Sequence, residues 1–327
     1  MKLRHLKDMA DIRGEHRGQQ RPTVPAKSVP SVSPPTFTLD TIHHIEEAHI
    51  VHLARQVEVS MDLFPSESMA VYRVVGGGVS AVTIPFLGQQ INRTLGLGMK
   101  GPVRDYDIKQ LENLNRVANL SSSVLLCPYA DPSALQALAV CGYGVDSFLN
   151  IYARSLADLP VARDPRPDMA QPWDFMYSPD TCVSRAPATE AGMAAFIHNS
   201  VDGFKDGGRP VPFLRTLAEM AALRADTVLY LARIDGEIAG CGALAFMETE
   251  YGRVAHIYID STAPAFRGRG VQRALIRARI VDAKRMGYDF ITIHASPGVG
   301  TGRNAEKEGF RLAYTKPIFT KRETQKL

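Results

Sequence analysis

The chain has 327 residues, of which 45% are hydrophobic and 22% are charged, and its formal net charge is +4. This balance is typical of a globular protein with sizeable cores, and the length predicts about two domains. The basic residues are dispersed and no apolar run reaches ~20 residues, so the composition argues against nucleic-acid binding and against a membrane span.

The four cysteines include no C-x-x-C pair. Their spacing therefore argues against a zinc site, and a disulfide framework is not expected either. The N-terminus lacks the apolar stretch of a signal peptide. The sequence therefore predicts a protein of the reducing cytoplasm that carries no metal ion.

Composition divides the chain into four segments. Residues 1–36 are polar, rich in proline and poor in large apolar side chains, which predicts a disordered tail. Residues 37–156 are expected to form a first α/β domain. Residues 157–174 are again rich in proline and are expected to be a linker. Residues 175–327 are expected to form a second domain.

In the first domain, the run "VVGGGVSAV" (74–82) lies between two β-like stretches and predicts a hairpin turn. Residues 121–156 read as strand, helix and strand, a pattern that returns near the C-terminus of the chain. The first domain is therefore interpreted either as a degenerate copy of the second or as an unrelated α+β domain. The segment Asp105–Arg116 is acidic and free of glycine.

The second domain shows the alternation β-α-α-β-β-β-α-β-α-β. Asp235-Gly236 joins two β-rich runs and predicts a hairpin, and Gly287 follows a helical pattern as a terminating glycine does. This order predicts an α+β fold with a mixed sheet. We expect strands at 180–186, 227–234, 237–247, 253–261, 289–296 and 310–319, and helices at 189–200, 211–224, 271–286 and 301–308.

The stretch "AFRGRGVQRALI" (265–276) places glycines and arginines directly before a helical pattern. Glycine lets a ligand approach the backbone, and a helix N-terminus presents unpaired N–H groups and a partial positive charge. This combination favours an anion site, most often for phosphate. Neither a dinucleotide-binding glycine motif after a first strand nor a Walker loop is present.

These residues resemble the GNAT superfamily of acyl-CoA-dependent N-acetyltransferases. The family signature is Arg/Gln-x-x-Gly-x-Gly/Ala, and Arg267, Gly270 and Gln272 stand at its marked positions. The stretch "RNAEKEGF" (303–310) resembles the second family motif, and the order of elements also agrees. The resemblance covers about residues 178–322 and implies a GNAT-like acyltransferase fold, with two related halves if the first domain is a copy.

The resemblance implies acetyl-CoA as co-substrate. Backbone N–H groups of the glycine loop would bind its pyrophosphate, with the helix dipole behind them. A backbone N–H on the fourth strand would serve as the oxyanion donor, and an asparagine would bind the pantetheine arm. The residues expected to contact acetyl-CoA are Ile259, Ser261, Thr262, Arg267, Gly268, Arg269, Gly270, Val271, Gln272, Arg273 and Asn304.

The catalytic acid and base are less clearly marked. The family commonly places a tyrosine four residues before the glycine of Gly-Phe, where this chain has Ala305. Tyr314 is the nearest tyrosine downstream and is the candidate acid. His256 alternates with Tyr258 and Asp260 on one face of a strand, and it is the candidate base because its unperturbed pKa suits proton transfer.

The sequence therefore predicts an acetyltransferase that acts on an amine of a small molecule or peptide, by direct attack in a ternary complex. The alternative is a non-catalytic acyl-CoA-binding or scaffold protein. The first domain lacks a phosphate loop in its acidic segment, so one acyl-CoA site is expected. That domain would wall an acceptor cleft between the halves, cover a sheet edge or mediate a homodimer.

Overall fold

The computed structural model describes residues 37–157, 159, 175–178 and 181–321. Residues from Phe37 onward belong to one compact unit. The expected tail and nearly all of the expected linker lie outside the described residues.

The described strands form a single mixed sheet of 12 strands, in the order β1-β2-β3-β4-β12-β5-β11-β10-β9-β8-β7-β6. They are β1 (Ala70–Arg73), β2 (Val79–Val82), β3 (Thr94–Leu95), β4 (Ser123–Leu125), β5 (Tyr143–Ser155), β6 (Phe175–Ser178), β7 (Thr181–Arg185), β8 (Thr227–Ile234), β9 (Glu237–Thr249), β10 (Gly252–Thr262), β11 (Phe290–Ala295) and β12 (Arg311–Lys321).

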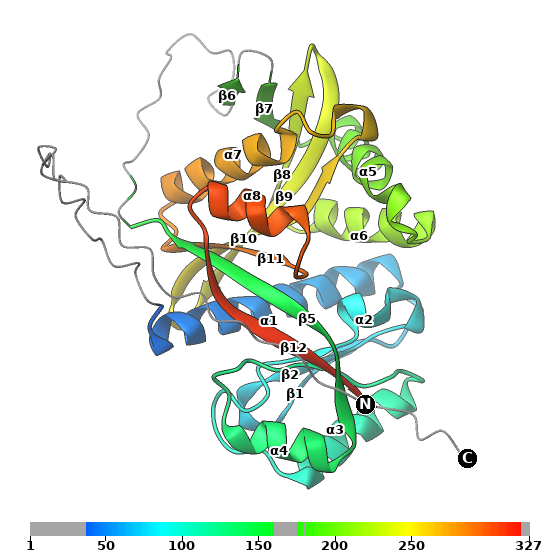
Figure 1. Ribbon diagram of the computed structural model, residues 1–327. Coiled ribbons are helices and arrows are strands. Elements are labelled where there is room, and N and C mark those ends of the chain that lie inside the picture. The colour runs from blue at the N-terminus through cyan, green and yellow to red at the C-terminus, as the bar shows by residue number, and fades with distance from the viewer. Residues whose placement is uncertain (1–36, 158, 160–174, 179–180, 322–327) are drawn as a thin grey trace, which may run out of the picture. The chain divides into compact units, whose positions relative to one another are not determined.

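Helices flank this sheet (Figure 1). They are α1 (Leu39–Leu63), α2 (Gly88–Ile91), α3 (Asp105–Val117), α4 (Pro132–Val140), α5 (Glu190–Phe204), α6 (Val211–Leu223), α7 (Val271–Arg285) and α8 (Gly300–Lys307). None of the helices in the described ranges has the length and apolar character that crossing a membrane requires.

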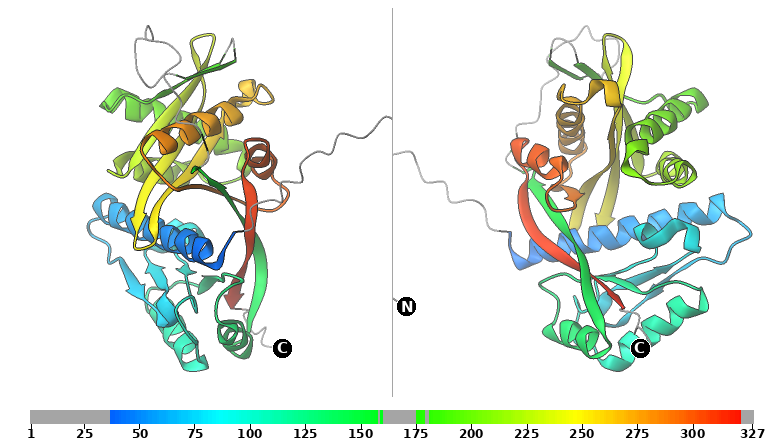
Figure 2. Two further views of the ribbon diagram at one scale, coloured as in Figure 1. Left: turned by 90° about the vertical axis from the view of Figure 1, so that its left-hand side faces the viewer. Right: turned by 45° about the vertical axis from the view of Figure 1, so that its right-hand side comes forward.

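The second half of the chain folds as its sequence pattern predicts. Each expected strand and helix from β7 to β12 is present, with bounds shifted by a few residues at most places. Helix α7 covers one face of β8–β10, and α5 and α6 cover the other (Figure 2). The side chains of Leu275 and Ile276 on α7 are fully buried, and Gly287 follows the end of α7 with a φ of +75°. The predicted mixed α/β fold is confirmed.

The two halves exchange strands at the centre of the sheet. Strand β5, from the first half, lies between β11 and β12 and is antiparallel to both. Strand β12, from the second half, lies in turn between β4 and β5. Figure 1 shows the two long strands crossing the molecule side by side. Each half therefore completes its sheet with a strand of the other.

The first half repeats the order of the second in shortened form. The predicted turn at 74–82 is a hairpin, in which Arg73 pairs with Val79. The parallel pair β3 and β4 corresponds to β10 and β11, with α3 between them in the chain as α7 is in the second half. Helix α4 and β5 then correspond to α8 and β12. This repetition favours a degenerate copy over an unrelated domain.

Helix α1 is the element that the sequence pattern did not predict. It runs for 25 residues between the two groups of elements seen in Figure 1 and contacts β9, β10 and α6 as well as β1–β3. Thr38 caps its first turn, where the side chain accepts from the N–H of Thr41. Its buried face includes polar residues, namely His44, Glu46, His49, His52 and Gln56.

Candidate functional site

A β-bulge interrupts the end of β10. Tyr258 pairs with Ala243 and Ser261 pairs with Cys241 on β9, so Ile259 and Asp260 oppose a single residue. Ile259 has a φ of +50°, in the left-handed region that a β-branched side chain rarely adopts. The bulge interrupts the regular pairing of Ile259 and Asp260 with β9. A backbone N–H that leaves a ladder at a bulge can donate to a ligand or to developing negative charge.

A buried ion pair supports this bulge from α7. The guanidinium of Arg279 is fully buried and pairs with the carboxylate of Asp260. Its Nε also donates to the carbonyl of Leu275 at 2.9 Å, and its Nη1 donates to the carbonyl of Ala243 at 3.1 Å. Arg279 thus joins α7 to both strands at the irregularity. The sequence pattern gave no sign of this role.

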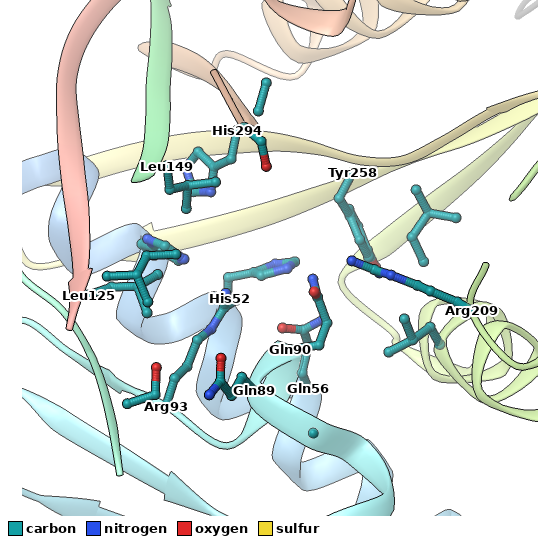
Figure 3. Close-up of a pocket in the computed structure, with 18 of the residues that line it drawn as sticks. His52, Gln56, Gln89, Gln90, Arg93, Leu125, Leu149, Arg209, Tyr258 and His294 are labelled. Atoms are coloured by element: carbon teal, nitrogen blue, oxygen red, sulfur yellow. The ribbon is translucent and has the colours of Figure 1, made fainter. Parts of the chain in front are cut away.

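Strands β10 and β11 separate at the same level. Their parallel pairing extends from Val254–Phe290 to Ile257–Ile293 and goes no further. A cavity of about 760 Å³, here called the central cavity, opens beside the separated ends. Figure 3 shows His294 and Tyr258 of the second half above it, and Gln56, Gln89 and Arg93 of the first half below it. Its polar or charged lining includes His49, His52, Gln56, Gln89, Gln90, Arg93, Ser123, Arg209, His256, Tyr258, His294 and Ser296.

The predicted phosphate loop lies between the bulge and α7. Gly268 and Gly270 have φ values of +78° and +81°, and a Cβ on either would meet no atom within 4 Å. Helix α7 begins after Gly270 without a side-chain cap. Its first N–H groups therefore face open space that a phosphate could fill, so the loop fits the pyrophosphate of acetyl-CoA.

The arginines around the loop are engaged with carboxylates. Arg267 pairs with Asp206 at 2.9 Å, and Arg269 lies 3.7 Å from Asp235. Both of these arginine side chains are more than one-third exposed, so such pairs can open at little cost. The predicted contacts of these arginines with acetyl-CoA remain predictions.

Arg273 is held more firmly. Its Nε lies 2.6 Å from Glu308, which also pairs with Arg277 at 2.6 Å and is itself buried. One carboxylate thus holds two guanidinium groups, and Arg273 would have to leave this pair to turn toward acetyl-CoA.

Other predicted contact residues link neighbouring elements. The amide of Asn304 donates to Oε1 of Gln272 at 2.8 Å, and the amide of Gln272 donates to Thr301 at 3.1 Å. The side chain of Ser261 donates to the carbonyl of Asn199 at 3.0 Å. Val271 is buried, and Thr262 pairs again with Gly240. The hydroxyl of Ser261 is therefore engaged within the chain, and the predicted contacts of Ser261, Val271 and Thr262 with acetyl-CoA remain predictions.

Four histidines form a continuous cluster on the cavity wall. Their ring centroids lie 4.4 Å apart for His49 and His294, 4.3 Å for His294 and His256, and 4.8 Å for His256 and His52. Lys316 lies 3.1 Å from Nδ1 of His49, and Arg224 lies 3.0 Å from Nδ1 of His52. These cations can only donate, so both nitrogens accept and both rings are neutral.

The environment lowers the basicity of all four rings. Burial, followed by the charges of nearby cations, lowers the pKa values of His49, His52 and His294 well below the usual value. The same causes lower the pKa of His256 to about 3. Despite their number, no group of His, Cys, Asp or Glu within the described ranges is arranged to hold a metal ion.

His256, the predicted base, does line the central cavity. Its Nδ1 lies 3.0 Å from Oγ1 of Thr292, whose hydroxyl donates to the carbonyl of Ala255 at 3.4 Å. Thr292 therefore accepts from Nδ1–H, which leaves Nε2 of His256 as the unprotonated nitrogen. Nε2 of His256 can therefore accept a proton, although the low pKa of the ring makes it a weak base.

Tyr314, the predicted acid, does not reach the cavity. Its hydroxyl donates to Glu46 at 2.5 Å, and its ring is buried with Ile42, Ile45 and Cys127. This position does not support the predicted role of Tyr314, which remains a prediction. Strand β12 is inserted beside β5, and this side chain contacts Glu46 of α1. Tyr258 is the tyrosine that lines the cavity, and burial raises its pKa to about 12.

The equivalent helix start in the first half is closed to anions. The acidic segment forms the beginning of α3, where Asp107 accepts from the N–H of Arg104 at 2.8 Å. A carboxylate of the chain thus occupies the place of a bound phosphate. The loop before α3 does contain glycines, which precede the acidic segment, but it packs on the chain itself. Its Lys100 N–H donates to the carbonyl of Gly76 at 2.6 Å.

Comparison with known proteins agrees with this geometry. Residues 195–303 match the model of the acetyltransferase (GNAT) family. A GCN5-related N-acetyltransferase from Kribbella flavida has a TM-score of 0.53 and 14% identity, over 84% of this chain and 97% of that one. A tandem GNAT protein from the clavulanic acid biosynthesis pathway has a TM-score of 0.52 and 12% identity, over 78% and 83% of the two chains. No curated protein matches the sequence.

The fold is therefore that of the GNAT proteins, and it resembles that of a tandem GNAT protein. In this chain the described strands of both halves form one sheet. The match to the acetyltransferase (GNAT) family model lies within the second half, which carries the glycine loop.

Proposed function

We propose that this protein transfers the acetyl group of acetyl-CoA to an amine held in the central cavity, by direct attack in a ternary complex. The observation that carries the proposal is the uncapped N-terminus of α7, which is bounded by Gly268 and Gly270 and follows the bulged end of β10. When bound, acetyl-CoA supplies the thioester whose acetyl group is transferred.

Three parts of the chain would serve the reaction. The N–H groups at the start of α7 would bind the pyrophosphate. The N–H groups of the bulge at Ile259 and Asp260 would donate to the oxygen that gains negative charge, and the cavity would hold the amine beside them. Holding both reactants can remove roughly 7–11 kcal/mol of the barrier at best, and a pre-oriented oxyanion donor adds roughly 3–4 kcal/mol.

The cavity also favours a neutral amine. Burial and nearby positive charge both lower the pKa of an amine, and the lining contains Arg93 and Arg209. As the C–N bond forms and the C–S bond breaks, Nε2 of His256 would take the proton that the amine loses. Tyr258 is the candidate proton donor to the leaving thiolate, since its raised pKa keeps the hydroxyl protonated.

One observation favours the second candidate, a non-catalytic acyl-CoA-binding protein. Ala305 stands where the GNAT family commonly has its tyrosine acid, and it lies fully buried on the core side of α8. The two candidates share the acetyl-CoA site and differ only in chemistry.

Replacing Gly270 with valine tests the shared site. A Cβ at this position would project into the space assigned to the pyrophosphate, and the φ of +81° strains any β-branched residue. We expect calorimetry to show at least ~10-fold weaker acetyl-CoA binding, the effect of losing one or two charge-assisted hydrogen bonds. Gly208 provides a matched control, since it also has positive φ and open space but lies outside the loop. Equal affinity of the wild type and Gly270→Val would refute the assignment.

A further inference from the structure

Arg93 stands out among the cations that line the central cavity. It lies between α2 and β3, on the first-half wall of the central cavity opposite His294 and Tyr258 (Figure 3). Its Nε is inaccessible to solvent and has no hydrogen-bond partner in the described structure. Buried polar groups are nearly always paired, so an unpaired guanidinium nitrogen on a cavity wall needs an explanation.

The other buried cations near the cavity each have a carboxylate. Arg224 pairs with Asp226 at 2.8 Å, and Lys316 pairs with Glu46 at 2.7 Å. Arg93 has no such partner in the described ranges, and none of the residues found to line the cavity is Asp or Glu. Burial alone lowers the pKa of Arg93 to about 10, which leaves it charged at neutral pH.

Two further buried atoms on the cavity wall lack partners. They are the acceptor Oε1 of Gln56 and the hydroxyl of Ser123. The lining residues therefore include a cation without a carboxylate partner, together with a hydroxyl and an amide oxygen that would have to turn toward the cavity to meet a ligand. An amine can donate to the carbonyl oxygen, and an anion can accept from the cation and the hydroxyl.

We propose that the acceptor is an amine that also carries a compact anionic group, a carboxylate or a phosphate, and that Arg93 binds this group. The inference rests on the acetyl transfer proposed above and names the substrate class for the same site. It also disfavours polyamines and other polycations, because the lining residues offer no carboxylate to hold a second ammonium group.

Matched acceptors test the proposal on the unaltered protein. L-leucine is compared with leucinamide, and phosphoethanolamine with ethanolamine, at the same concentration of acetyl-CoA. The release of free CoA thiol is measured. We expect the anionic member of at least one pair to give kcat/KM ~10- to 100-fold above its neutral partner, the effect of one charge-assisted hydrogen bond. The pair with the larger ratio identifies carboxylate or phosphate. Equal rates in both pairs, or faster neutral amines, would overturn the proposal.

Variants of Arg93 provide the second test. In Arg93→Met the preference for the anionic acceptor should fall by the same factor, and in Arg93→Lys part of it should return. Removing an unpaired buried charge should also raise the melting temperature of the protein without ligand, whereas losing a structural contact would lower it. Arg215→Met is the matched control, because this exposed arginine of α6 does not line the cavity.

Thermal shift without acetyl-CoA separates the two proposals. If acetyl-CoA fails to bind, the acetyl-transfer proposal falls. L-leucine or phosphoethanolamine, the anionic probes, should still raise the melting temperature of the wild type and not that of Arg93→Met. If acetyl-CoA binds but the anionic probe stabilises both proteins equally, the Arg93 subsite is refuted while the acetyl-CoA site stands.

Discussion

Arg279→Met should lower the free energy of unfolding by about 3–5 kcal/mol, the cost of leaving a buried charge unpaired. The substitution removes the partner of Asp260, whose side chain is 8% exposed. Burial raises the pKa of this carboxyl group even while the charge of Arg279 acts to lower it. The substitution also leaves the carbonyl of Ala243 without the donor that Nη1 provides. Urea denaturation measures the loss, and acetyl transfer should fall with it because the bulge of β10 loses its support from α7.

A surface pair supplies the control for Arg279→Met. Arg55 and Glu58 lie 2.8 Å apart on α1, and both side chains are 56% exposed. Arg55→Met should therefore change stability by less than about 1 kcal/mol. If Arg279→Met costs no more than this control, the buried pair does not hold the bulge.

Acidification from pH 7 to pH 5 should destabilise the protein steeply. The pKa values of His49, His52, His256 and His294 are lowered in the folded state, so the unfolded chain binds protons near pH 6.5 that the folded protein excludes. Stability is therefore complete above this pH and falls as pH decreases toward the folded pKa values. Each histidine contributes at most about 1.4 kcal/mol per pH unit, and the four together at most about 5.5 kcal/mol per pH unit.

Denaturant titrations at pH 7, 6 and 5 measure this slope. His256→Gln should reduce it by up to one proton equivalent, about 1.4 kcal/mol per pH unit. His198→Gln, a substitution of an exposed histidine on α5, should leave the slope unchanged. A wild-type slope that His256→Gln does not alter would show that His256 binds protons in the folded protein as readily as in the unfolded chain, which would contradict its lowered pKa.

The second half of the chain was predictable because local signals agree with its fold. The hairpin at Asp235-Gly236, the glycine loop and the terminating Gly287 each mark a boundary that the backbone then adopts. Non-local pairing was not predictable in this way. Strands β5 and β12 have ordinary strand patterns. Neither pattern shows that β5 of the first half pairs with β11 and β12 of the second, or that β12 pairs with β4 and β5 of the first. The position of Tyr314 followed from this pairing.

Helix α1 was missed for a physical reason that also explains the incomplete site. A helix is recognised by apolar residues at helical spacing, but several positions on the buried face of α1 are polar. Among them, His49, His52 and Gln56 line the central cavity, and Glu46 neutralises Lys316. The same residues that make the site obscure the helix in the sequence. The spacing of three to four residues among Glu46, His49, His52 and Gln56 was the available signal.

The account depends most directly on whether an amine accepts the acetyl group. The decisive measurement is the release of CoA thiol from acetyl-CoA by the purified protein, with and without a panel of amines, with mass spectrometry of the products. We expect thiol release that requires an amine and that is matched by an equal amount of acetylated product. At a low concentration of acetyl-CoA, Gly270→Val should give at least ~10-fold less of both. Tight binding of acetyl-CoA without amine-dependent release would contradict the account and identify a binding protein instead.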